Sequence, residues 1–131
     1  MKKIFHLSTC QTNQKILKDW KPGKEFTLQN IKEKNISAEE LDIAAGVLGS
    51  YEALFSRRAL KYKTMGLADK KLSEKDYRKL ILSEYTFLKR PVLINGKEVF
   101  AGSAKESVEG GRRSVRGREQ KGERRRVKGE G

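Results

Sequence analysis

Cysteine is almost absent from this sequence, because Cys10 is the only one among 131 residues. A chain with one cysteine cannot form an internal disulfide. Any oxidised state of Cys10 is therefore a sulfenic acid, a disulfide-linked dimer or a mixed disulfide with a partner or a small thiol. We also expect no metal site and no bound cofactor.

Long apolar runs are absent as well. The amino-terminal Met1-Lys2-Lys3 leads into only four residues of apolar character, which is too short for the core of a signal peptide. No apolar run approaches the length that spans a membrane. These absences lead us to expect a cytoplasmic protein that makes no contact with a membrane.

Acidic residues are in deficit, with 17 Asp and Glu against 30 Lys and Arg, and the formal net charge is +13. The composition changes at residue 110, since residues 110–131 are mostly Gly, Arg, Glu and Lys and have almost no apolar residues to bury. We therefore predict one domain over 1–109 and a disordered, basic, Arg/Gly-rich tail over 110–131. The tail is either an RNA-tethering arm or a solvated appendage, and its lack of aromatic residues favours the appendage.

The first half of the domain reads as strand, helix, strand. Residues 2–7 and 25–28 have strand patterns, and residues 11–20 between them have apolar residues at helical spacing. Strands joined through a helix in this way are expected to be parallel. Pro22-Gly23 ends the first helix.

Several helices and a hairpin are expected next. Ser37 and Glu40 form a capping box, Ser73 and Asp76 a weaker one, and a helical insertion is predicted over about 37–86. The later strands, 91–94 and 97–100, flank Asn95-Gly96, which is typical of a type I′ turn. A short helix is expected over 104–109. The order predicts an α/β fold of the thioredoxin-like type.

The predicted order of elements places Cys10 at a position that favours a reactive thiol. It follows a strand and precedes a helix, so backbone N–H groups and the positive end of the helix dipole are expected beside it. Such surroundings favour the thiolate, the form that attacks disulfides and oxyanions. The alternative is a small buried apolar residue.

Four motifs carry a family resemblance. They are His6-Leu7-Ser8-Thr9-Cys10-Gln11-Thr12 with Lys15, then Leu54-Phe55-Ser56-Arg57-Arg58, then Tyr62 to Leu67, then Leu88-Lys89-Arg90-Pro91-Val92-Leu93-Ile94. Over residues 2–108 the set resembles the ArsC/Spx family of glutaredoxin-dependent arsenate reductases and their relatives. The resemblance implies a thioredoxin-like (glutaredoxin-like) fold with a mixed sheet of about four strands and an inserted helical subdomain.

The resemblance also implies roles for individual residues. Cys10 is the expected nucleophile, and Thr12, Arg58 and Arg90 are expected to bind an oxyanion or the carboxylates of glutathione. Pro91 is expected to follow a cis peptide bond and to face the thiol. His6, if protonated, would favour the thiolate; otherwise it is a strand histidine satisfied by the backbone, and Arg58 could likewise be a solvated charge.

The sequence departs from the family pattern at two places. Asn13 stands where many relatives have a second cysteine, so no Cys-x-x-Cys switch can form. Of the three arginines that surround the oxyanion in the one-cysteine arsenate reductases, only Arg90 is matched. Ser56 stands at the second position, with Arg57 and Arg58 displaced, and Phe100-Ala101-Gly102 covers the third.

These features lead to three hypotheses. The first is a thiol oxidoreductase of the arsenate reductase type, with glutathione or another low-molecular-weight thiol and glutaredoxin as external reductants. The second is a non-catalytic regulator similar to Spx that binds RNA polymerase. The third is a nucleic-acid-binding protein that acts through residues 110–131.

Overall fold

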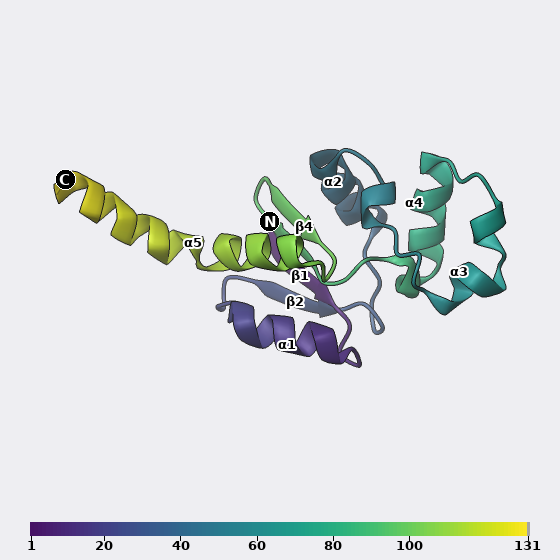
Figure 1. Ribbon diagram of the computed structural model, residues 1–131, viewed down its shortest axis with the longest axis horizontal. Coiled ribbons are helices and arrows are strands. Elements are labelled where there is room, and N and C mark those ends of the chain that lie inside the picture. Colours follow the sequence, from purple (N-terminus) through teal and green to yellow (C-terminus); the bar gives the residue numbers. More distant parts are fainter. Residues whose placement is uncertain (131) are drawn as a thin grey trace.

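The computed structural model describes the backbone of residues 1–130 and the side chains of residues 1–117. A mixed sheet lies at its centre (Figure 1) and consists of β1 (Lys2–His6), β2 (Thr27–Asn30), β3 (Val92–Asn95) and β4 (Glu98–Ala101). The strand order is β2-β1-β3-β4. Strands β1 and β2 are parallel, and the other neighbours are antiparallel. The predicted mixed sheet is therefore confirmed.

Helices cover both faces of this sheet. They are α1 (Gln11–Trp20), α2 (Ala38–Leu48), α3 (Leu60–Thr64), α4 (Glu74–Ser83) and α5 (Lys105–Glu130), with 3₁₀ turns η1 (Glu52–Leu54), η2 (Leu67–Asp69) and η3 (Tyr85–Phe87). All elements from α2 to η3 fall between β2 and β3 in the sequence. Figure 1 shows α3 and α4 together at one end of the molecule, away from α1.

Alternation along the strands separates two apolar clusters. Ile4 of β1 and Leu93 of β3 pack on one face of the sheet, with Trp20 of α1 and Val115 of α5. Phe5, the next residue of β1, belongs to the larger cluster on the opposite face, which includes apolar residues of α2 and α4. Because successive side chains of a strand point to opposite faces, one short strand anchors both clusters.

Local signals in the sequence fix several helix ends. Both predicted capping boxes form, with the Ser37 and Ser73 hydroxyls accepting hydrogen bonds from the N–H groups of Glu40 and Asp76. Helix α1 ends as predicted, at Trp20, and Lys21 follows it in a left-handed conformation. The second strand lies two residues later than the predicted 25–28.

The turn between β3 and β4 differs from the prediction. Asn95 pairs with Glu98, so the two loop residues are Gly96 and Lys97 rather than Asn95 and Gly96. Only Gly96 of these two has a positive φ, of 61°. A type I′ turn needs positive φ at both central residues, so the predicted turn type is wrong.

Helix α5 runs past the domain boundary that the sequence predicted at residue 109. Gly110 lies against the Phe100 ring and Gly111 against the Trp20 ring, where a Cβ atom would come within 2.4 and 2.3 Å of ring carbons. Val115 is buried in the same cluster. The glycine-rich composition predicted disorder from residue 110 on. In the structure, Gly110 and Gly111 instead allow α5 to pack closely against the two aromatic rings, and the local sequence does not show this contact. From residue 118 on, the predicted tail lies outside the described side chains.

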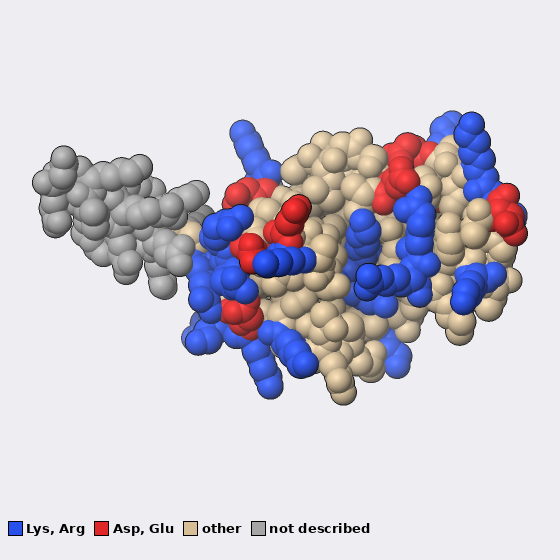
Figure 2. Space-filling model, in the orientation of Figure 1, with Lys and Arg blue, Asp and Glu red and all other residues tan. Residues whose placement is uncertain are grey.

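Charged side chains are distributed over the surface in a mixed pattern. On the face shown in Figure 2, Lys and Arg occur over both the sheet end and the helical end, with Asp and Glu between them. Asp19 of α1, for example, pairs with Arg112 of α5 at 2.6 Å. This ion pair adds a polar link to the apolar contact between α1 and α5.

Candidate functional site

A cleft of about 550 Å³ opens at the amino-terminal end of α1. It is lined by Cys10, Thr12, Asn13, Ser56, Arg57, Arg58, Lys89, Arg90, Ala101, Gly102, Ser103, Ala104 and Ser107. The fold thus brings together four of the predicted site residues, namely Cys10, Thr12, Arg58 and Arg90. His6 is not among the lining residues.

Cys10 is held in a tight turn between β1 and α1. Its backbone N–H donates to the Leu7 carbonyl at 3.0 Å, and the residue adopts an extended conformation directly before the helix. Its side chain is half-buried. The thiol therefore lies at the entrance to a helix, partly screened from solvent and facing the cleft.

The first turn of α1 offers unpaired backbone donors next to Cys10. The N–H of Gln14 donates a hydrogen bond to the Cys10 carbonyl at 3.1 Å. The N–H groups of Gln11, Thr12 and Asn13 make no hydrogen bond within the described part of the chain. Free amides at a helix start, together with the helix dipole, favour a bound anion.

Asn13 is a buried polar residue that contacts the thiol. Its side chain is 1% exposed. The amide oxygen accepts a hydrogen bond from the Leu7 N–H at 3.0 Å, and the amide nitrogen lies 3.5 Å from Cys10 Sγ. Sequence reasoning noted only that this position lacks a cysteine, because the contact depends on how the β1–α1 turn folds.

Arg57 and Arg58 are neighbours with different surroundings. The Arg57 guanidinium donates to the Glu52 carboxylate at 2.6 Å and to the Tyr77 hydroxyl at 3.0 Å. Arg58 makes no hydrogen bond or ion pair with any side chain that the structure describes, and it is exposed. Arg58 is thus available to a ligand, whereas Arg57 is held by protein groups.

Lys89 and Arg90 bring two further cations to the cleft. One terminal nitrogen of Arg90 donates to the carbonyls of Thr86 and Leu88, at 3.1 and 3.2 Å. The Arg90–Pro91 peptide bond is cis, as the family resemblance implies. Lys89 was not predicted as a site residue. The described lining holds four basic side chains and no Asp or Glu, which makes the cleft strongly cationic.

The two cationic segments are joined directly through their backbones. Phe55 and Leu88 form an antiparallel bridge. The Ser56 N–H donates to the Phe87 carbonyl at 2.7 Å, and the Lys89 N–H donates to the Leu54 carbonyl at 2.8 Å. These bonds fix Arg58 and Arg90 to one continuous wall of the cleft.

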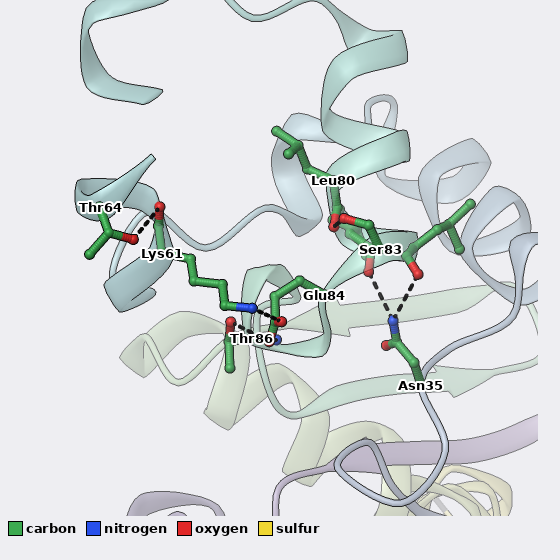
Figure 3. Close-up of polar contacts among 9 residues, drawn as sticks. Asn35, Lys61, Thr64, Leu80, Ser83, Glu84 and Thr86 are labelled. Atoms are coloured by element: carbon green, nitrogen blue, oxygen red, sulfur yellow. Dashed lines mark hydrogen bonds and ion pairs between the residues drawn. The ribbon is translucent and has the colours of Figure 1, made fainter. Parts of the chain in front are cut away.

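Polar side chains near these two segments form further contacts (Figure 3). Lys61 of α3 lies 2.7 Å from the Glu84 carboxylate, which also accepts from the Thr86 hydroxyl at 2.9 Å. The hydrogen bond from Lys61 lowers the pKa of Glu84, so the carboxylate stays ionised. Asn35 donates to the Ile81 carbonyl at the end of α4, at 2.9 Å. The ion pair between Lys61 and Glu84 therefore links α3, which follows Arg58, to the η3 turn that precedes Arg90.

His6 lies at the end of β1, outside the lining of the cleft. Its Nδ1 atom is buried and has no hydrogen-bond partner among the described residues. Burial lowers the pKa of His6 from its ordinary 6.5, and the Glu33 carboxylate opposes this effect to a smaller extent. Burial therefore favours the neutral imidazole over the protonated form that would stabilise the thiolate.

A model of the ArsC family matches residues 5–110. The chain belongs to the ArsC family. The match covers the end of β1, all of β2, β3 and β4, the helices between β2 and β3 and every residue of the cleft.

Solved structures show the same ArsC-type fold. An arsenate reductase from Vibrio cholerae is 23% identical, with a TM-score of 0.65 over 82% of this chain and 94% of its own. A protein from Bacteroides fragilis described as related to the ArsC family is 22% identical, with a TM-score of 0.70 over 84% and 97%. An arsenate reductase-related protein from Brucella melitensis is 22% identical, with a TM-score of 0.60 over 83% and 92%. No curated protein sequence matches the chain.

Among the residues that the structure describes, no helix combines the length and the apolar character needed to cross a bilayer. Within the same residues, no three His, Cys, Asp or Glu side chains are grouped in a way that could hold a metal ion.

Proposed function

We propose that this ArsC-family protein is a thiol oxidoreductase in which the Cys10 thiolate attacks arsenate, or a related oxyanion, bound in the cleft. One observation carries the proposal: Cys10 shares a cleft with Arg58, Lys89 and Arg90, and the described lining contains no carboxylate. Guanidinium groups and free helix amides are the donors that suit a tetrahedral oxyanion.

The chemistry requires external thiols. Sγ of Cys10 forms a bond to arsenic, and one arsenate oxygen leaves as water after it takes up protons. Reduction of As(V) to As(III) takes two electrons, which a single cysteine cannot supply by forming an internal disulfide. Glutathione, or another small thiol, and glutaredoxin supply the two thiols. The first displaces Cys10 from arsenic as a thiolate, and the second attacks the sulfur of the first, so that the two thiols leave as one disulfide and arsenic leaves as arsenite with the electron pair.

The direct test is arsenate-dependent oxidation of NADPH in a system with glutathione, glutaredoxin and glutathione reductase. We expect turnover that depends on arsenate, is absent when phosphate replaces it, and is lost in Cys10→Ser. Absence of Cys10-dependent turnover with arsenate and every physiological thiol system tried would falsify the proposal.

A pair of arginine variants tests which cation binds the anion. Because Arg58 is free and Arg57 is held by Glu52 and Tyr77, Arg58→Ala is expected to raise KM for arsenate about tenfold or more while leaving the melting temperature unchanged. Arg57→Ala is expected to lower the melting temperature and to change KM less. Equal effects of the two substitutions on KM would contradict the assignment.

A second candidate function is that of a non-catalytic regulator that binds RNA polymerase, similar to Spx. The observation in its favour is a set of exposed apolar side chains in the helical segment, Ile43, Val47, Leu60 and Met65. Binding of purified polymerase to wild type and to Cys10→Ser alike, without arsenate turnover, would favour this function. Failure to recover any polymerase subunit would exclude it.

A further inference from the structure

We propose that Asn13 is a catalytic residue that stabilises the Cys10 thiolate through an N–H···S hydrogen bond. The proposal rests on the proposed function, because it assigns Asn13 a part in the same thiol chemistry. It begins from a contact that the sequence did not predict, the 3.5 Å approach of the Asn13 amide nitrogen to Cys10 Sγ.

The orientation of the Asn13 amide is fixed by its other partner. The Leu7 N–H can only donate, so the atom it meets at 3.0 Å must be the amide oxygen of Asn13. The amide nitrogen is thereby directed to Cys10 Sγ. Since the side chain is 1% exposed, water does not compete for either group. The turn that positions Cys10 thus also positions its donor.

The donor acts in both halves of the reaction. A hydrogen bond to a charged acceptor is stronger than one to a neutral acceptor, so the Asn13 N–H favours the thiolate over the thiol. When an external thiol later breaks the bond between arsenic and Sγ, Cys10 leaves as a thiolate, and the same donor stabilises this leaving group.

Asparagine at position 13, unlike cysteine, cannot resolve an adduct on Cys10. A second thiol there would attack the adduct on Cys10 and form an internal disulfide. The amide has no such reaction, so the adduct persists until an external thiol arrives. Asn13 therefore supplies the hydrogen bond and reserves the resolving step for an external thiol.

Asn13→Asp is the sharpest test, because the carboxylate keeps an acceptor for the Leu7 N–H and replaces the donor to Sγ by a negative oxygen. The readout is the rate of Cys10 alkylation by iodoacetamide as a function of pH. We expect the rate at pH 7 to fall about tenfold or more, with the plateau at high pH unchanged. Asn13→Ala, which lacks both groups, is expected to lower the rate at pH 7 about threefold.

Gln14→Glu is the matched control. It makes the same amide-to-carboxylate change one residue further along α1, at an exposed side chain that donates to the Ser8 carbonyl at 3.0 Å and makes no hydrogen bond to Sγ. We expect its alkylation profile to stay within about twofold of wild type, since an exposed charge is well screened.

Circular dichroism and cooperative unfolding establish that each variant is folded. If Asn13→Asp does not fold, the comparison is made with Asn13→Ala instead. Superimposable pH profiles for wild type and the Asn13 variants, or an equal shift in Gln14→Glu, would overturn the inference. A shifted profile in the Asn13 variants together with no arsenate turnover in wild type would instead refute the proposed function, and of the inference only the hydrogen bond from Asn13 to the thiolate would stand.

Discussion

At the scale of single residues, the burial of His6 makes the folding stability depend on pH. Its Nδ1 atom is buried without a hydrogen-bond partner in the part of the chain that the structure describes, and burial lowers the pKa of His6 below the ordinary 6.5. The unfolded chain therefore takes up a proton near pH 6.5, at a higher pH than the folded chain does. Folding stability must fall as the pH drops through 6.5 towards the lower pKa of the folded state.

Because His6 is the only histidine, its effect can be isolated. We predict that the free energy of unfolding of wild type is lower at pH 5.5 than at pH 7.5, and that His6→Gln loses most of this difference. Denaturant unfolding at the two pH values measures it. The carboxylates titrate mainly below this window, since their pKa values start near 4. The same pH dependence in both proteins would show that His6 is not its source.

Site residues divide into those with a local or motif signal and those without one. Cys10, Thr12, Arg58 and Arg90 were predicted, and all four line the cleft. Lys89 and Asn13 were not predicted as site residues. Nothing in the adjacent sequence shows that Lys89 lines the cleft, or that the Asn13 amide contacts the Cys10 sulfur. For His6 the sequence left a charged and a neutral role open, and its burial favours the neutral imidazole.

At the scale of elements, the packing of α5 depends on glycines that the composition had suggested would be disordered. A Cβ atom at Gly111 would approach Trp20 to 2.3 Å, and the indole is 1% exposed and donates to the Val108 carbonyl. We predict that Gly111→Ala destabilises the fold by about 1–3 kcal/mol, because the helix must move away from the ring. Denaturant unfolding measures this change.

Gly117 provides the control in the same helix. A Cβ atom there would meet nothing within 4 Å, so Gly117→Ala gains the helical preference of alanine without a clash. We expect it to leave stability unchanged or to raise it by up to about 1 kcal/mol. An equally small effect of Gly111→Ala on stability would contradict the close packing of Gly111 against Trp20.

Elements were predictable where their signals are local. The capping boxes at Ser37 and Ser73 and the Pro22-Gly23 stop gave helix bounds that the structure reproduces closely. The hairpin was found, but its turn moved by one residue because pairing across the strands sets the register. The extension of α5 past residue 109 was missed because Trp20, near the other end of the sequence, provides part of its packing surface.

At the scale of the whole molecule, the net charge of +13 and the cationic cleft favour anionic reagents. Iodoacetate and iodoacetamide alkylate the same thiol but differ by one negative charge. We predict that the ratio of their rates at Cys10 is about tenfold higher than for free cysteine at low salt. This ratio should fall towards the free-cysteine value in 1 M salt, where the Debye length is about 3 Å.

Two comparisons make the measurement specific. The rate with iodoacetamide alone is expected to change little with salt, because the reagent is neutral. Arg58→Ala is expected to lower the rate ratio, since it removes the free guanidinium. A ratio that equals that of free cysteine at all salt concentrations would mean that the cations do not act on the thiol.

The cleft takes its lining from segments that stretch from Cys10 to Ser107. On a ribosome the thiol is therefore made first and the last cleft-lining residues about 5–20 s later, at ordinary rates of synthesis. Until then Cys10 has neither Arg90 nor the β4–α5 loop beside it. The complete cleft, with its cations beside the thiol, can therefore form only after Ser107 has been synthesised.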